Sequence, residues 1–463
     1  MPEPTPPTAA GTPRAAPSLG ALLRLAWPIV ISRSSQVVVG VSDALLTAHL
    51  GQSALAAVTT GALNSFTLLI LPMGVVFIVS SFSSQLHGAG DATGARRYGF
   101  YGLGVALFTQ LLALVSLPVV PALLGRLDYA PDVRALMVDY LAVRLCSSGA
   151  AIGIEALANY YGGLGNTRRP MLASVAAMVL NVIGNWVLID GHLGAPAMGV
   201  RGSALASALA TWAAFLGLLL AFVLDGRRLA QVVPRLRLSE FTRMLRFGLP
   251  SGFNWFFEFA AYSFFINVVV GGLGTTALAA MMTVMQINSV SFMPAFGLAS
   301  AGAILVGQAI GAGAADEVPR AVGITLRTGA VFQGAIGVLY LVVPRQLLAP
   351  FMPAGEGSAE LLDLGAQLLM LSAAWQLFDS ALSTYAEALR AAGDTAYTLW
   401  VRVSIAWLVF APGSWLTVRV FHGGQRGAVV WLVVYLGLAA LALHLRFRSG
   451  AWRRLRLIEP TAG

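Results

Sequence analysis

The chain has 463 residues, of which 57% are hydrophobic and only 11% are charged, and its formal net charge is +9. Soluble globular proteins carry about 25% charged residues, so this composition excludes a soluble protein and predicts one that crosses a membrane many times. All 29 basic residues are arginine, and the absence of lysine excludes a Walker-type phosphate-binding lysine and Schiff-base chemistry.

Twelve apolar runs are long enough to cross a membrane, because a spanning helix needs about 20 residues. Several runs are longer than that, so we expect tilted helices, with kinks at Pro28, Pro72 and Pro294. The predicted fold is therefore an all-α polytopic membrane protein. The approximate limits of the runs are 21–48, 54–83, 98–124, 135–164, 170–190, 201–225, 245–272, 276–307, 322–344, 360–390, 394–418 and 427–447.

Arginine is concentrated in alternate loops and in both tails. The positive-inside rule places the richer set, and with it both termini, in the cytoplasm, for a multi-pass protein of the cell (inner) membrane. The charge lies in short loops between apolar runs, so it indicates topology and contact with membrane lipids and not a nucleic-acid partner. The richer loops contain Arg96, Arg97, Arg168, Arg169, Arg227, Arg228, Arg235, Arg237, Arg243, Arg246, Arg320 and Arg327, and the opposite side contains Arg126, Arg134, Arg201, Arg345, Arg419 and Arg426.

The two halves of the chain repeat each other. Leu50–Ala57 (LGQSALAA) matches Leu273–Ala280 (LGTTALAA), and Gln85 matches Gln308 at the same spacing of 223 residues. A later motif, GNT at 165–167, matches GDT at 393–395 at a spacing of 228. Each half has an even number of spans, so the copies share one orientation and are related by an axis along the membrane normal. This arrangement predicts a substrate cavity between two lobes and alternating access by rocking.

The repeat divides the chain into five parts. We expect a disordered cytoplasmic N-tail at 1–18, an N-lobe of six spans at 19–225, a basic cytoplasmic linker at 226–244, a C-lobe of six spans at 245–448 and a cytoplasmic C-tail at 449–463.

Glu258 lies within the apolar and aromatic stretch Leu249–Phe265 (LPSGFNWFFEFAAYSFF). A charged side chain at this depth costs roughly 2.5–3.5 kcal/mol on insertion scales, so we expect it to face a polar cavity inside a helical bundle. The same helix face carries Ser251, Asn254 and Tyr262, because these residues and Glu258 are spaced at helical steps of three or four. The alternative is a single buried hydrogen bond that only stiffens the bundle.

Two more acids lie well inside apolar runs, Asp43 in the first and Asp379 in the tenth. Buried carboxylates and amides suit a hard cation, and burial also favours reversible protonation, so the same groups could couple to Na⁺ or H⁺. One hypothesis is Na⁺ at Glu258 and Asp379. The supporting polar residues are Ser32, Gln36 and Thr47 on the face of Asp43, Asn181 and Asn185 one turn apart in the fifth run, Asn254 and Tyr262 beside Glu258, and Ser372, Gln376 and Ser383 beside Asp379.

Other charges inside the runs have weaker interpretations. Glu155 is a minor candidate for a transport role. Glu387 and Arg390, three residues apart near a helix end, are expected to form a structural pair. Arg33 and Arg144 could each pair with an acid or extend toward the membrane surface.

Aromatic side chains crowd the seventh run. A cavity wall of this kind suits an organic cation through cation–π attraction, although such side chains also face lipid and neighbouring helices. The residues expected to line a substrate cavity are Trp255, Phe259, Trp375 and Asn288.

These features together resemble the multidrug and toxic compound extrusion (MATE) family, and most closely its NorM branch. The resemblance covers about residues 20–450 and implies two six-helix lobes in a V shape, with efflux of cationic, often polyaromatic compounds driven by Na⁺ or H⁺. It places the family's first-span, seventh-span and tenth-span acids on Asp43, Glu258 and Asp379. The features that carry it are Pro28, the repeated LGxxALAA, GAGD at 88–91, GNTRRP at 165–170, NVIGN at 181–185, the three acids and Gln376.

Three other functions are alternatives to efflux. A channel would also need polar spans, but the two-fold repeat and the isolated carboxylates favour alternating access. A flippase for lipid-linked saccharides, from the same superfamily, would favour an arginine-lined cavity for phosphate. A membrane-embedded enzyme would need a nucleophile with a base, or a metal site, and the sequence has no GxSxG, HExxH or CxxC. We therefore expect a transporter, not an enzyme, that acts as a monomer on small organic cations without a cofactor.

Overall fold

The computed structural model describes residues 16–127, 129–228, 234–351 and 358–458. Every secondary-structure element in these ranges is helical. Lipid offers no hydrogen-bond partners to the backbone, and a helix satisfies its own N–H and C=O groups. Eleven of the helices are long and apolar enough to cross a membrane, and a bent pair would make a twelfth. The predicted all-α, multi-span fold is confirmed.

The first half of the chain forms α1–α9. One expected span is broken: residues 135–164 fall on α6 and α7, which meet at an angle of 47°. Residues 54–83 fall on α2 and α3, which are separated only by the turn residue Phe77 and together form one candidate span. The helices are α1 (Leu19–Thr47), α2 (Gln52–Val76), α3 (Ile78–Gly88), α4 (Ala92–Ser116), α5 (Val120–Leu124), α6 (Pro131–Leu145), α7 (Ser148–Gly163), α8 (Arg168–Asp190) and α9 (Gly199–Arg228).

The second half forms α10–α17. A π-helical segment, Phe265–Val270, continues α10, and another, Ala406–Phe410, joins α15 to α16. The helices are α10 (Leu238–Phe264), α11 (Thr275–Gly311), α12 (Val318–Val342), α13 (Pro344–Leu348), α14 (Ser358–Ala392), α15 (Thr395–Ile405), α16 (Ala411–Arg419) and α17 (Gly424–Arg448).

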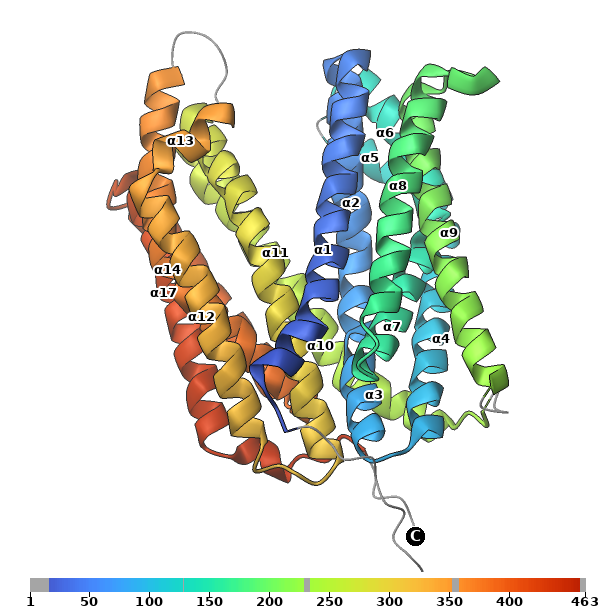
Figure 1. Ribbon diagram of the computed structural model, residues 1–463. Helices are drawn as coiled ribbons and strands as arrows, with labels where there is room; N and C mark the ends of the chain where they lie inside the picture. Colours follow the sequence, from blue (N-terminus) through green and yellow to red (C-terminus); the bar gives the residue numbers. More distant parts are fainter. Residues whose placement is uncertain (1–15, 128, 229–233, 352–357, 459–463) are drawn as a thin grey trace, which may run out of the picture.

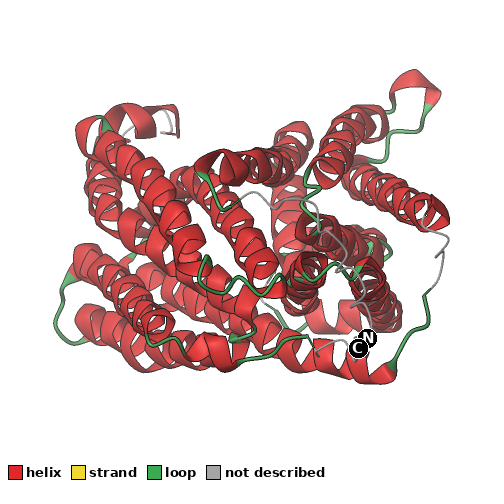
Figure 2. Cartoon of the chain, turned by 60° about the horizontal axis from the view of Figure 1, so that its bottom comes forward, coloured by secondary structure: helices red, strands yellow, loops and turns green. Residues whose placement is uncertain are grey.

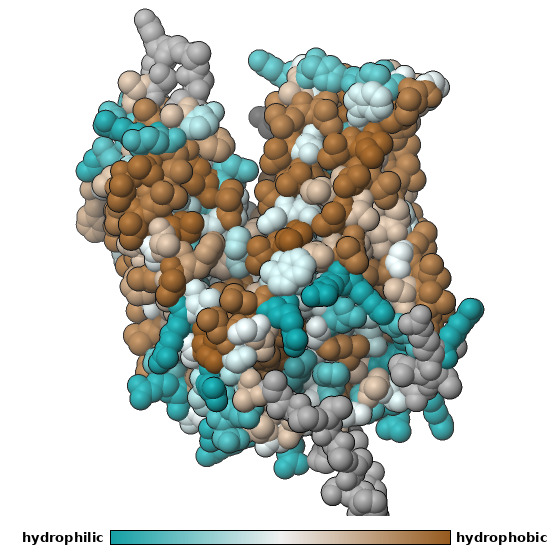
Figure 3. Space-filling view, viewed as in Figure 1, coloured by the Kyte–Doolittle hydropathy of each residue, from teal (hydrophilic) through white to brown (hydrophobic). Residues whose placement is uncertain are grey.

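The helices gather into two lobes that form a V (Figure 1). One lobe contains α1–α9 and the other α10–α17; they separate at the top of the view and meet at the bottom, where the first and the last described residues lie. Figure 2 shows the two groups from a second direction. Apolar side chains cover the middle of the molecule, and hydrophilic ones gather at its two ends (Figure 3).

The ends of the lobes differ from the expected boundaries. α9 continues to Arg228 and α10 begins at Leu238, so helices extend into both ends of the range 226–244 that was expected to be a linker. Residues 229–233 lie outside the described ranges. So do residues 1–15 of the expected N-tail and 459–463 of the C-tail, whereas Ser18 accepts a hydrogen bond from the backbone N–H of Ala21 and caps α1.

The contact surface between the lobes, here called the seam, contains equivalent interactions from the two halves of the chain. α1 packs against α11 of the other lobe, and α10 packs against α2. The side-chain amide of Gln85 donates to the carbonyl of Ala391 at 2.7 Å, and that of Gln308 donates to the carbonyl of Gly163 at 3.0 Å. The glutamines are 223 residues apart and their acceptors 228, the same spacings as the repeated motifs. The two bonds are therefore symmetry mates of one interaction.

Two glycines bring α3 and α11 into backbone contact at this seam. A Cβ atom on Gly311 would overlap the carbonyl oxygen of Gln85, and one on Gly88 would overlap the carbonyl oxygen of Gln308. These glycines are also 223 residues apart. The lobes meet closely because neither helix has a side chain at its crossing point.

Gly311→Ala is expected to lower stability by roughly 1–3 kcal/mol, because the backbone of α3 must move away from the added methyl group. Thermal unfolding of the purified protein in detergent measures this. The matched control is Gly323→Ala in α12, where an added Cβ has no atom within 4 Å. Equal melting temperatures for the two variants would contradict the proposed close contact.

Candidate functional site

A cavity of about 640 Å³ opens among helices of the second lobe. Its walls come from α10, α11, α14, α15 and α17, and Phe66 and Ile70 of α2 close it from the first lobe. The cavity expected between the lobes thus lies mainly inside one of them. The physical reason is that the polar faces of α10 and α14 turn toward each other within the second lobe.

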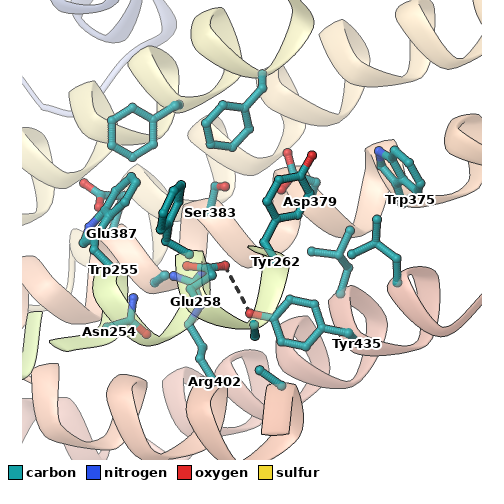
Figure 4. Close-up of a pocket in the computed structure, with 18 of the residues that line it drawn as sticks. Asn254, Trp255, Glu258, Tyr262, Trp375, Asp379, Ser383, Glu387, Arg402 and Tyr435 are labelled. Atoms are coloured by element: carbon teal, nitrogen blue, oxygen red, sulfur yellow. Dashed lines mark hydrogen bonds and ion pairs between the residues drawn. The ribbon is translucent and has the colours of Figure 1, made fainter. Parts of the chain in front are cut away.

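The polar face predicted for the seventh span does line this cavity. Ser251, Asn254, Glu258 and Tyr262 of α10 all border it. Their spacing places them on one side of the helix, and the remaining positions carry the rings and aliphatic groups that pack outward. Figure 4 shows the side chains of Asn254, Glu258 and Tyr262 along this face.

Glu258 is held by two partners from other helices. Arg402 of α15 forms an ion pair with its carboxylate, and the hydroxyl of Tyr435 in α17 donates to the same oxygen at 3.1 Å (Figure 4). The Arg402 side chain is only 15% exposed and that of Glu258 is 31% exposed. The charge on Glu258 is therefore compensated within the protein, so a single buried hydrogen bond does not describe it.

Sequence reasoning missed Arg402. It lies in the apolar run WVRVSIAW of the eleventh predicted span, and the rule that singles out an ionisable group inside a span applies to it as well as to Glu258. Tyr435 gave no comparable signal, because its neutral side chain lacks the charge that makes a residue conspicuous inside an apolar run.

Asp379 of α14 borders the same cavity as Glu258 but has different partners. The side-chain amide of Gln333 in α12 lies 3.4 Å from its carboxylate, a long hydrogen bond. Within the described part of the chain Asp379 has no ion pair. The structure thus brings the two predicted acids to one cavity, and of the two only Glu258 forms an ion pair with an arginine in the described part of the chain.

A network of amides continues from Asp379 along α14. The side-chain amide of Gln376 donates to the Asn288 oxygen at 2.6 Å, and the amide of Asn288 in α11 lies 3.3 Å from the Ser372 hydroxyl. Asn288 and Gln376 both border the cavity, as does Trp375 beside them. These contacts fix the direction of the amide groups and hold α14 against α11.

Aromatic rings form much of the remaining wall. Phe66 meets Phe259 edge-on at 5.9 Å, and Trp255 meets Phe296 at 5.6 Å between ring centroids. Tyr262 also borders the space. Ring faces carry partial negative charge, so a flat cation in this cavity would find both aromatic stacking and a carboxylate.

Asp43 occupies a separate site in the first lobe. The Asn181 amide donates to its carboxylate at 3.0 Å and the Asn185 amide at 2.5 Å, both from α8. The hydroxyl of Ser207 in α9, a partner that sequence reasoning did not find, donates to the other oxygen at 2.9 Å. Asp43 is 7% exposed. The asparagines approach it as their spacing predicted, and three neutral donors stabilise it in place of a counter-ion.

Two further charge pairs lie near the seam. Arg33 bonds both carboxylate oxygens of Glu155, at 2.8 and 3.0 Å, and the amide of Gln36 donates to Glu155 at 3.2 Å. Arg33 therefore pairs with an acid other than Asp43, and Gln36 supports that pair. The expected pairing of Glu387 with Arg390 is confirmed. Arg144 lies on α6, where the structure assigns it no role.

A two-lobed membrane bundle built from an internal repeat and enclosing a polar and aromatic cavity is an architecture typical of membrane transporters. Comparison with known families gives the particular family: the MatE family model matches residues 28–187 and 250–416, which is more than half of the chain. The chain therefore belongs to the MATE family, whose members are transporters and not enzymes.

Similar proteins cover nearly the whole chain. A protein of Pseudomonas putida named "Probable multidrug resistance protein NorM" is 30% identical over 95% of this chain and 96% of its own length. A protein of the same name from Bradyrhizobium diazoefficiens is 30% identical over 93% of both. A solved structure, described as the outward-facing conformation of a multidrug resistance MATE family transporter, has a TM-score of 0.86 at 21% identity and covers 96% of this chain and 98% of its own. It shows the same fold.

Glu155→Gln is expected to lower stability by roughly 3–5 kcal/mol, because it leaves the Arg33 guanidinium buried without a counter-charge. Asp139→Asn is the matched control: it breaks the exposed pair with Arg201, which water already screens, and should leave the melting temperature close to that of the wild-type protein. Thermal and chemical unfolding in detergent measures both. The double variant Arg33→Gln/Glu155→Gln should recover part of the loss. Equal losses of stability in Glu155→Gln and Asp139→Asn would refute the assignment of Glu155 as the counter-charge of Arg33.

Proposed function

We propose that the protein is a secondary active multidrug efflux transporter that exports aromatic organic cations in exchange for Na⁺ or H⁺. The observation that carries this proposal is the cavity in the second lobe, where Asp379 has no ion pair within the described residues and aromatic rings surround it. The carboxylate of Asp379 and the aromatic rings both attract an organic cation. The names of the similar NorM proteins support a role in multidrug resistance.

The proposed cation-coupling residues are Asp379, Glu258 and Asp43. Asp379 supplies a carboxylate without a counter-charge, which either H⁺ or Na⁺ can occupy when the substrate leaves. Glu258 borders the same cavity and takes part when its bond with Arg402 opens. Asp43 acts in the other lobe, where its three donors already satisfy it, so its protonation would rearrange bonds to α8 and α9. The two lobes therefore contribute different chemistry.

Alternating access is proposed to open and close the symmetric seam. The lobes are joined at the end where the described part of the chain begins and ends and where the arginine-rich loops lie, and they diverge at the other end. If the arginine-rich end faces the cytoplasm, the structure represents an outward-facing state. The paired bonds of Gln85 and Gln308 would then close the cytoplasmic side and must break for the inward-facing state to form.

A flippase for lipid-linked saccharides is less consistent with this cavity. Phosphate groups favour uncompensated arginine side chains. Both arginines that border the cavity, Arg390 and Arg402, are instead paired with glutamates.

Transport of ethidium in proteoliposomes tests the proposed function, with a Na⁺ gradient and a pH gradient imposed separately. We expect one gradient to drive transport in the wild-type protein, and both Glu258→Gln and Asp379→Asn to lose most of it, because each removes a carboxylate from the cavity. Asp363→Asn, which changes an exposed acid paired with Arg345, should transport normally. Wild-type rates in both cavity variants would reject coupling in the second lobe.

Membrane orientation can be tested by cysteine labelling after Cys146, the single cysteine, is replaced by serine. The segment between α8 and α9 contains Leu193, which is 83% exposed, and the first turn of α10 contains Ser239. These two segments lie at opposite ends of the molecule (Figure 1). An impermeant maleimide added to intact cells should label Leu193→Cys and reach Ser239→Cys only after permeabilisation. The reverse pattern would invert the proposed topology.

A further inference from the structure

Five charged side chains border the cavity in the second lobe. They are Glu258, Asp379, Glu387, Arg390 and Arg402. Two ion pairs join four of them, Glu258 with Arg402 and Glu387 with Arg390. With these groups ionised, the cavity carries a net charge of −1, and the charge is located on Asp379. This balance predicts how many positive charges the cavity accepts.

The two arginines have different roles. Arg390 also donates to the backbone carbonyl of Phe77 at 2.5 Å and contacts the Ser81 hydroxyl at 3.4 Å, so it ties α14 to the first lobe. Arg402 lies on α15 inside the second lobe, and its guanidinium pairs with Glu258 next to the ligand space (Figure 4). Its Nε atom is buried without a hydrogen-bond partner. The bond to Glu258 is therefore its main compensation.

We propose that Arg402 is a specificity-determining residue. By holding Glu258 in an ion pair, it leaves Asp379 as the single uncompensated carboxylate of the cavity, and so it favours organic cations with one positive charge over those with two. This inference rests on the proposed function, because it presumes that the cavity is where the organic cation binds.

The physical basis is the high cost of net charge in a site removed from water. A singly charged ligand beside Asp379 brings the cavity to neutrality. A doubly charged ligand of the same shape leaves one positive charge without a partner, close to the guanidinium of Arg402, and repulsion adds to the cost of desolvation. Without Arg402, Glu258 and Asp379 could each compensate one charge of such a ligand, so the preference would reverse.

Equilibrium binding to the purified protein in detergent tests this directly, with ethidium and propidium as fluorescent probes. The two compounds share the same ring system, and propidium carries a second quaternary ammonium group. Arg402→Gln changes the cavity charge to −2 and is expected to shift the ratio of the two Kd values toward propidium by roughly tenfold or more. Arg402→Lys retains the charge and should keep the wild-type preference.

Two further variants separate charge from structure. Glu258→Gln leaves Arg402 unpaired and the cavity neutral, so it should weaken binding of both probes and of propidium more. The double variant Arg402→Gln/Glu258→Gln returns the net charge to −1 and should restore the wild-type ratio. If Arg402→Gln does not fold, as judged by its melting temperature, the Kd ratios of the wild-type protein, Glu258→Gln and the double variant still show whether the net charge of the cavity sets the preference. If the substitutions only disturbed packing, both probes would bind more weakly, and the ratio of their Kd values would not follow the net charge of the cavity.

The outcomes distinguish this inference from the proposed function. If the wild-type protein binds ethidium and all variants keep the same ratio of Kd values, Arg402 does not set specificity, although the transporter proposal stands. A ratio in the double variant that matches Arg402→Gln would also overturn the inference. If the wild-type protein binds neither probe and no gradient moves ethidium, both proposals fail.

Discussion

The cost of an ionised side chain away from water governs the interior of this protein. Such a group costs several kcal/mol unless an opposite charge or several hydrogen bonds compensate it. Arg33, Arg390 and Arg402 each meet a glutamate, and Asp43 meets three neutral donors. Asp379 differs from them all, because its recorded bond is a long one to an amide. The functional proposals depend on that one difference.

The internal repeat organises the contacts between the lobes but not the chemistry within them. The paired glutamines, their carbonyl acceptors and the paired glycines all recur at the repeat spacing, since each lobe presents the same surface to the other. The charged residues of the interior do not recur. At the same spacings, Asp43 corresponds to Ile266, Glu258 to Ser35, Asp379 to Ala151 and Arg402 to Ser174. The duplicated backbone thus supports two different polar sites.

This separation means that the two-lobed fold does not by itself fix the charge of the cavity. Solved MATE structures match the chain closely at 21% identity, because helix length, small residues at crossings and apolar outer faces are enough to specify the bundle. A few side chains in the cavity then set its charge. The fold alone does not identify the ligand, and the proposed preference for a singly charged aromatic cation rests on these particular residues.

Hydropathy and helical spacing are local properties, so the sequence was enough to predict the membrane class, the twelve apolar runs, the two halves and the polar face of α10. It also singled out Asp43, Glu258 and Asp379, since an acid inside an apolar run is conspicuous. Which charges are compensated depends instead on how distant helices pack. Glu258 and Arg402 are 144 residues apart, and Arg33 and Glu155 are 122 residues apart, so no local pattern shows that such side chains meet. The packing of α10 against α15 places them together, and so leaves Asp379 as the unpaired carboxylate of the cavity.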